Sequence, residues 1–292
     1  MLNDTIKNLT EENYRTALDI WKTGSQKYIL TLDSEMQLNS LNIKNTVVTN
    51  IILQIKDIRK TEFLLDILSY NKEMASCNNE GIQQMFTITR HFEKLYDEFK
   101  VVVSKRGILK SIENFSYLQN KWKKIKNDSL QYFDTETDIE SYFNLNETTI
   151  NDKDFWIKAL NEQEILFLYF GLSGYGAEFS STEIIQRENA FKTGIIDWSL
   201  QKTTKQEVHK APFNIVQEIT GTFEPSKKWM EKGYGKMPFF EGIPFKEDFN
   251  IKGNYVFDAE SGFIKQATIL VNEIVHPSIL FHKLKYTLIP IE

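Results

Sequence analysis

The chain has 292 residues, of which 41% are hydrophobic, 13% aromatic and 26% charged, so it can bury a core without disulfides or metal ions. Its net charge of −5 argues against nucleic acid as a partner, and a single cysteine, Cys77, excludes an internal disulfide and a thiolate metal site. The longest apolar run, 165–170, is far shorter than a membrane-spanning helix, and the N-terminus lacks the apolar core of a signal peptide. We therefore expect no transmembrane segment and a cytoplasmic location, with a periplasmic one left open if a signal was removed.

The first third of the chain predicts one helix followed by a β-meander. Thr10 with two glutamates after it is typical of a helix N-cap, and apolar residues then recur at helical spacing until Gly24. From there the apolar residues alternate with polar ones, as in half-buried strands of an antiparallel sheet. The segments concerned are 28–38, 47–55, 59–70, 99–103 and 108–112.

Two helices are predicted in the middle of the chain. In the segment 112–132 apolar residues recur every three or four positions, with four lysines on the other side. We interpret the lysines as a solvated face, and docking on an acidic partner or a membrane surface is the alternative. Asn161 and Glu164 resemble a capping box that begins a second helix, and Gly171 is typical of its end.

The rest of the chain is again β-like, with strand composition in 211–223, 254–274 and 280–291. The sequence therefore predicts an α+β protein: an extensive antiparallel β-sheet, meander or half-barrel-like, with two or three helices packed on one face. Residues 1–133 would form the N-terminal helix, the first strands and the amphipathic helix. The acidic segment 134–154 would be a linker or surface excursion. Residues 155–292 would add a helix and further strands that complete the same fold.

The segment GLSGYG, 171–176, is the best candidate for catalysis. A nucleophile elbow requires G-x-S-x-G on a turn from a strand into a helix, whereas here the last glycine comes one residue late and the glycines follow a predicted helix. The four histidines are isolated, and the acidic segment lacks the spacing of a calcium loop. We therefore predict no catalytic residue, no metal site and no cofactor, although a serine hydrolase that uses Ser173 remains an alternative.

A second distinctive stretch is an aromatic loop at 229–249. Because loops are usually polar, its large apolar side chains have to pack on a core, surround a ligand or contact another protein. A long β-connection anchored by its own side chains is the plainest interpretation, and the functional one is a binding surface. The candidate binding residues are Trp229, Tyr234, Met237, Phe239, Phe240, Ile243, Phe245 and Phe249.

These patterns favour a non-enzymatic binding module, such as an adaptor, a chaperone or an inhibitor. It would recognise a protein partner through the aromatic loop and a sheet face. The alternative is a carrier that holds an apolar ligand or lipid in a cavity between the sheet and its helices. An open apolar cavity would favour the carrier, and a filled core would exclude it.

Overall fold

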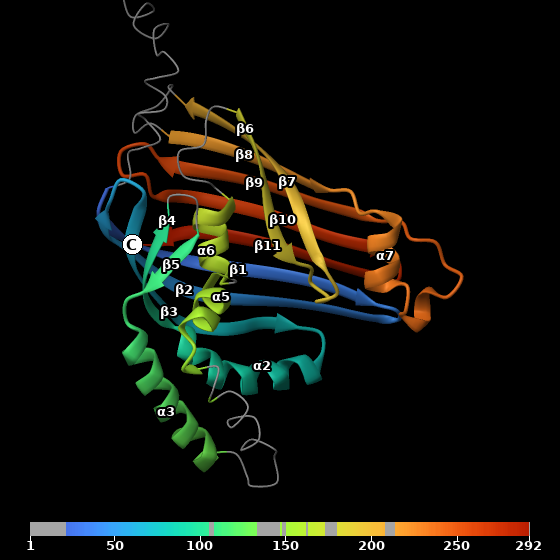
Figure 1. Cartoon of the computed structure of the whole chain (residues 1–292), viewed down its shortest axis with the longest axis horizontal. Helices are drawn as coiled ribbons and strands as arrows, with labels where there is room; N and C mark the ends of the chain where they lie inside the picture. Colours follow the sequence, from blue (N-terminus) through green and yellow to red (C-terminus); the bar gives the residue numbers. More distant parts are fainter. Residues whose placement is uncertain are drawn as a thin grey trace, which may run out of the picture.

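The computed structural model describes residues 22–104, 108–132, 147, 150–161, 163–172, 180–207 and 214–291. Within them, a single antiparallel sheet of 11 strands has the order β5-β4-β3-β2-β1-β11-β10-β9-β8-β7-β6 (Figure 1). The predicted α+β class and antiparallel sheet are thus confirmed. The helix predicted after Thr10 lies outside the described residues.

All five strands predicted in the first third are present, and they form consecutive antiparallel neighbours. Their alternating sequences bury every second side chain on one face of the sheet, which explains why the alternation was visible. The strands are β1 (Gly24–Leu38), β2 (Leu41–Ile58), β3 (Glu62–Cys77), β4 (Glu98–Ser104) and β5 (Leu109–Ile112).

The second half of the chain supplies the other six strands, and the last of them pairs with the first strand of the chain. In the register, Leu30 of β1 pairs with Leu288 of β11, so the first and last strands meet in the middle of one continuous sheet. Two of these strands, β6 and β7, were not predicted, because their sequences are rich in polar residues. The six are β6 (Ser180–Glu188), β7 (Ile195–Glu207), β8 (Asn214–Phe223), β9 (Asp248–Asp258), β10 (Ile264–His276) and β11 (Leu280–Ile291).

The described residues contain five α-helices, so the prediction of two or three was too low. They are α2 (Glu80–Glu93), α3 (Phe115–Tyr132), α5 (Lys153–Asn161), α6 (Glu164–Leu166) and α7 (Lys227–Tyr234). Short 3₁₀ turns follow α2 and α7, at η1 (Lys94–Tyr96) and η3 (Pro238–Phe240), and α6 runs on as a π-helix, η2 (Phe167–Leu172).

The predicted boundaries of the second central helix were wrong at both ends. Asn161 is the last residue of α5, and its side-chain oxygen accepts a hydrogen bond from the backbone N–H of Leu109. The extended residue before α6 is Gln163. Gly171 does not end the helix, because the π-helix continues through it to Leu172. The apolar run 165–170 is helical as predicted.

The π-helix packs into the face of the sheet that we name the concave face, which is the face toward the viewer in Figure 1. At one side, the guanidinium of Arg187 on β6 lies 3.7 Å from the ring centre of Phe167. Next to it, the hydroxyl of Tyr255 on β9 donates a 2.9 Å hydrogen bond to the carbonyl of Leu168. Leu168 and Tyr255 are fully buried.

The following two residues of the π-helix contact the first strands of the chain. The hydroxyls of Tyr169 and Tyr28 on β1 lie 3.3 Å apart, and their rings meet edge to face. The ring of Phe170 lies 5.9 Å from that of Phe63 on β3. Four consecutive residues of the π-helix therefore contact β6, β9, β1 and β3, no two of which are adjacent in the sheet.

The β6–β7 hairpin crosses in front of the concave face and is attached at its turn (Figure 1). The indole N–H of Trp229 on α7 donates to the carbonyl of Ile195, at 3.1 Å. The backbone N–H of Ala190 donates to the carboxylate of Glu273 on β10, at 2.6 Å. The sheet thus curls until its β6 edge faces its own middle strands.

If packing of the π-helix against the concave face stabilises the curled sheet, removal of a buried side chain from this helix should lower the stability of the protein. We expect Leu168→Ala to lower the free energy of unfolding by about 2–5 kcal/mol, because it leaves a cavity where the side chain is fully buried. Leu270→Ala, on the outer face where the side chain is 38% exposed, is the matched control and should cost far less. Urea unfolding measures both, and equal losses would contradict this role.

Candidate functional site

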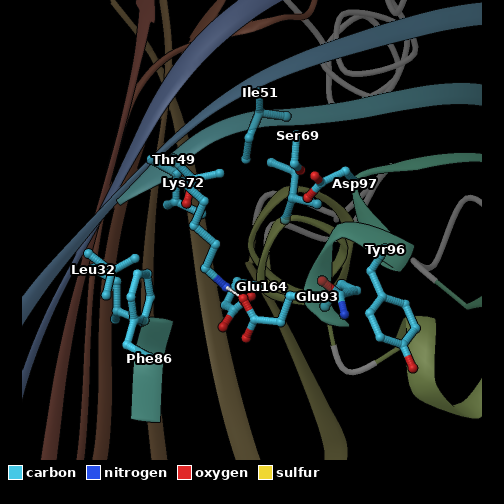
Figure 2. Close-up of a pocket in the computed structure, with 14 residues that line it drawn as sticks. Leu32, Thr49, Ile51, Ser69, Lys72, Phe86, Glu93, Tyr96, Asp97 and Glu164 are labelled. Carbon is cyan, nitrogen blue, oxygen red and sulfur yellow. Dashed lines mark hydrogen bonds and ion pairs between the residues drawn. The ribbon is translucent and has the colours of Figure 1, made fainter. Parts of the chain in front are cut away.

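A cavity of about 370 Å³ lies beside the π-helix, under α2. Its walls come from β1, β2 and β3 on the concave face, from α2 and the adjacent η1, and from the start of α6 (Figure 2). This volume lies within the range of small-molecule sites in proteins, roughly 300–1,000 Å³. The cavity is therefore the candidate functional site.

The floor of the cavity is largely apolar because of the strand register, and the hydroxyl-bearing Thr49 and Ser69 also line it. Leu32 of β1 is paired with Val47 of β2, and the side chains of Leu30 and Ile51 continue the same face. Leu30 and Ile51 are buried, whereas Leu32 and Val47 are only half-buried. The π-helix thus covers one part of the alternating apolar face and leaves the next part open.

A bulge in β3 directs a lysine into this apolar surface. Between the pairs Val48–Glu73 and Asn50–Tyr70, β2 has one residue where β3 has two. The first of these two, Asn71, has a φ of 49°, a left-handed conformation that asparagine adopts more readily than most residues. The second is Lys72, whose side chain enters the cavity.

Helix α2 covers the cavity without burying any of its own residues. Asn79 caps the helix by accepting a hydrogen bond from the backbone N–H of Ile82, at 3.1 Å. Phe86 lines the cavity, whereas Met85 and Ile88 are 59% and 47% exposed. A helix with so little buried apolar area gains little stability from packing.

Two ion pairs attach the C-terminal half of α2 to the rest of the protein. The ammonium of Lys72 lies 2.7 Å from the carboxylate of Glu93. Arg90 donates two hydrogen bonds of 3.0 Å to Asp97, which follows η1. Because all four side chains are partly exposed to water, each pair contributes on the order of 1 kcal/mol, and the bidentate Arg90–Asp97 pair is the stronger of the two. The attachment is specific in geometry and weak in energy.

The remaining charged group of the cavity is Glu164, in the first turn of α6, where a carboxylate is favoured by the helix dipole. Figure 2 shows its side chain directed toward Lys72 and Glu93. The charge of Glu164 also affects Tyr286, which lies on β11 opposite Leu32 of β1. Burial, and to a lesser degree the Glu164 carboxylate, raises the pKa of Tyr286.

The aromatic loop connects β8 to β9, and the structure buries much of it. Three of the eight candidate residues are buried in the core, namely Tyr234, Phe240 and Phe249. Four are partly buried against the core, namely Trp229, Met237, Phe239 and Phe245, and Ile243 is 38% exposed. The side chains thus anchor the loop, none of the eight lines the cavity, and their role in binding a partner stays a prediction.

Ser173 lies outside the described residues, but another serine meets a histidine. The Oγ of Ser34 on β1 lies 3.0 Å from Nε2 of His282 on β11. Glu273, on β10, is the cross-strand neighbour of His282. Because Ser34 sits between two paired strands, its surroundings lack the free backbone N–H groups of an oxyanion hole. The sequence could not indicate this contact, which depends on the pairing of the two ends of the chain.

No protein-family model matches the chain, and no curated protein matches it either. Among solved structures, one entitled "Lipid-protein interactions in lipovitellin" aligns with 93% of this chain and 25% of that chain, at 11% sequence identity and a TM-score of 0.44. The chain thus spans about a quarter of that protein. A likeness at this score supports no conclusion about this chain.

In the part of the chain that the structure describes, no three or more His, Cys, Asp and Glu side chains are placed to hold a metal ion. Over the same residues, no helix combines the length and the apolar character that crossing a membrane requires. The absence of a metal or cofactor from the protein's function stays a prediction.

Glu273 and His282 carry opposite pH dependences. Burial raises the pKa of Glu273 to about 7 and lowers the pKa of His282 to about 4. Between about pH 4.5 and 6.5, folded Glu273 keeps a proton that the unfolded chain has lost, so its contribution to stability falls as pH rises. Over the same range only the unfolded chain protonates His282, so the contribution of the histidine rises with pH. In the native protein the two contributions oppose each other.

We therefore expect single substitutions to separate the pH dependence that Glu273 contributes from that of His282. Glu273→Gln should make the free energy of unfolding rise more steeply with pH than in the native protein, and His282→Asn should make it rise less or fall. Each change in slope is at most about 1.4 kcal/mol per pH unit. Urea unfolding at pH 4.5, 5.5 and 6.5 measures the slopes. Two variants with the native slope would show that neither group titrates as its burial requires.

Proposed function

We propose that this protein is a carrier, a binding protein for an apolar or amphipathic small molecule that it holds in the cavity under α2. The observation that supports this most is the cavity itself: an open apolar floor in a sheet whose neighbouring surface is filled by the π-helix. Exposed apolar surface in a concavity is unfavourable in water and becomes favourable when a ligand covers it.

The cover over this floor also suits a carrier. A ligand has to enter and leave. Helix α2 has no fully buried residue and is held by the partly buried Phe92, which packs against the core, and by two partly exposed ion pairs. Such a helix can move away at a smaller cost than the buried strands. A side chain such as Phe86 would then close over the bound molecule. A protein that used this region only as structure would gain stability by filling the space with larger side chains.

Recognition of a protein partner through the aromatic loop is a separate prediction, and the cavity does not test it. The loop contributes Ile243 as an exposed large side chain, whereas Tyr234, Phe240 and Phe249 are buried. The carrier proposal therefore rests on the cavity alone.

The test is binding of Nile red, a neutral dye whose fluorescence rises in apolar surroundings. We expect the native protein to bind it and Ser69→Trp to lose binding, because Ser69 lines the cavity and an indole there would occupy the space. Leu68→Trp is the matched control: the same substitution one residue earlier on β3, where the side chain is 39% exposed.

The control should bind Nile red as the native protein does. If the native protein gives no fluorescence increase, or if Ser69→Trp binds as well as Leu68→Trp, the cavity is not a ligand site. Circular dichroism of each variant confirms that the sheet is intact before binding is compared.

A further inference from the structure

We propose that the polar end of the ligand carries one positive charge, as in a long-chain amine or quaternary ammonium compound, and pairs with Glu164. The inference rests on the proposed function, since it names the class of molecule that the cavity would hold. It follows from the charges in the cavity, taken pair by pair.

Three carboxylates and one ammonium line the cavity: Glu93, Asp97, Glu164 and Lys72. Two of the three carboxylates are already paired with a cationic side chain. Glu93 pairs with Lys72 at 2.7 Å, and Asp97 accepts two hydrogen bonds from Arg90. A carboxylate that is already paired attracts a ligand cation weakly, because the two partners cancel much of each other's field.

The carboxylate of Glu164 makes no ion pair or hydrogen bond with any residue that the structure describes. It is half-buried, at the first turn of α6, and lines the same cavity as the apolar floor. The unbalanced charge of the lining is therefore a single negative one. In a partly exposed site beside an apolar floor, the group that complements this charge best is a cation attached to an apolar chain.

The layout of the cavity fits such a molecule. In Figure 2, Leu32 and Phe86 lie at one side of the cavity, and the side chains of Lys72, Glu93 and Glu164 converge nearer its centre. An alkyl chain would cover Leu32 and Val47 on the floor, while its ammonium reached the Glu164 carboxylate.

An anionic amphiphile, such as a fatty acid, is the less favourable occupant. Its carboxylate would have to take Lys72 from Glu93, which leaves Glu93 unpaired and releases one attachment of α2. The displaced carboxylate, the ligand and Glu164 would then share one ammonium. Like charges brought together in a partly buried site repel more strongly than they do in water.

The test compares three chains of equal length as displacers of Nile red, each below its micelle concentration: dodecyltrimethylammonium, neutral dodecanol and dodecanoate. We expect the cation to displace the dye at the lowest concentration and dodecanoate at the highest. Glu164→Gln should weaken binding of the cation roughly fivefold, which is the upper range for a partly exposed ion pair, and should leave binding of dodecanol unchanged.

Glu113→Gln is the control, because it removes the same charge from an exposed residue outside the cavity and should change nothing. If dodecanol displaces the dye but the cation has no advantage, or if Glu164→Gln keeps the native preference, this inference is wrong and the carrier proposal stands. If none of the three chains displaces the dye, the carrier proposal itself fails.

Discussion

The structure depends on the packing of one π-helical segment, Phe167–Leu172, into the concave face of an 11-stranded sheet. An antiparallel sheet of this width has a large apolar face that must be covered, and the sequence provides short helices for that purpose. Successive residues of the segment reach β6, β9, β1 and β3, so the sheet curls around them. Burial of rings on both sides, together with the Tyr255 hydrogen bond, stabilises that curl.

The same packing explains where the cavity is. The π-helix covers the face from β6 across to β3 but leaves Leu32 and Val47 half-buried, and α2 covers these two residues without burying any residue of its own. The filled centre supplies stability, and the loosely covered flank remains available for a ligand. This division resembles the general separation between a rigid scaffold and a binding region of low local stability.

The sequence predicted the parts of this fold that depend on local pattern. The apolar residues alternate in 28–38 and 47–55 because each strand has one face toward the core. They recur with a helical period in 112–132 for the same reason. The β6–β7 hairpin was missed because both strands contain many polar residues. One of these, Lys202, is buried and pairs with Glu183, whose side chain is 41% exposed. The cavity could not be predicted at all. It results from the β1–β2 register, the bulge before Lys72 and the position of a helix that is distant in sequence.

The most direct test of the central claim, that the uncovered flank of the concave face holds a small apolar molecule, is a crystal structure of the protein saturated with 12-bromododecanol. The anomalous signal of bromine locates the end of the alkyl chain without reference to the protein density. We expect one peak in the cavity, against Leu32 and Val47 and beneath α2. A peak at the aromatic loop, or no ordered bromine at saturation, would contradict the account.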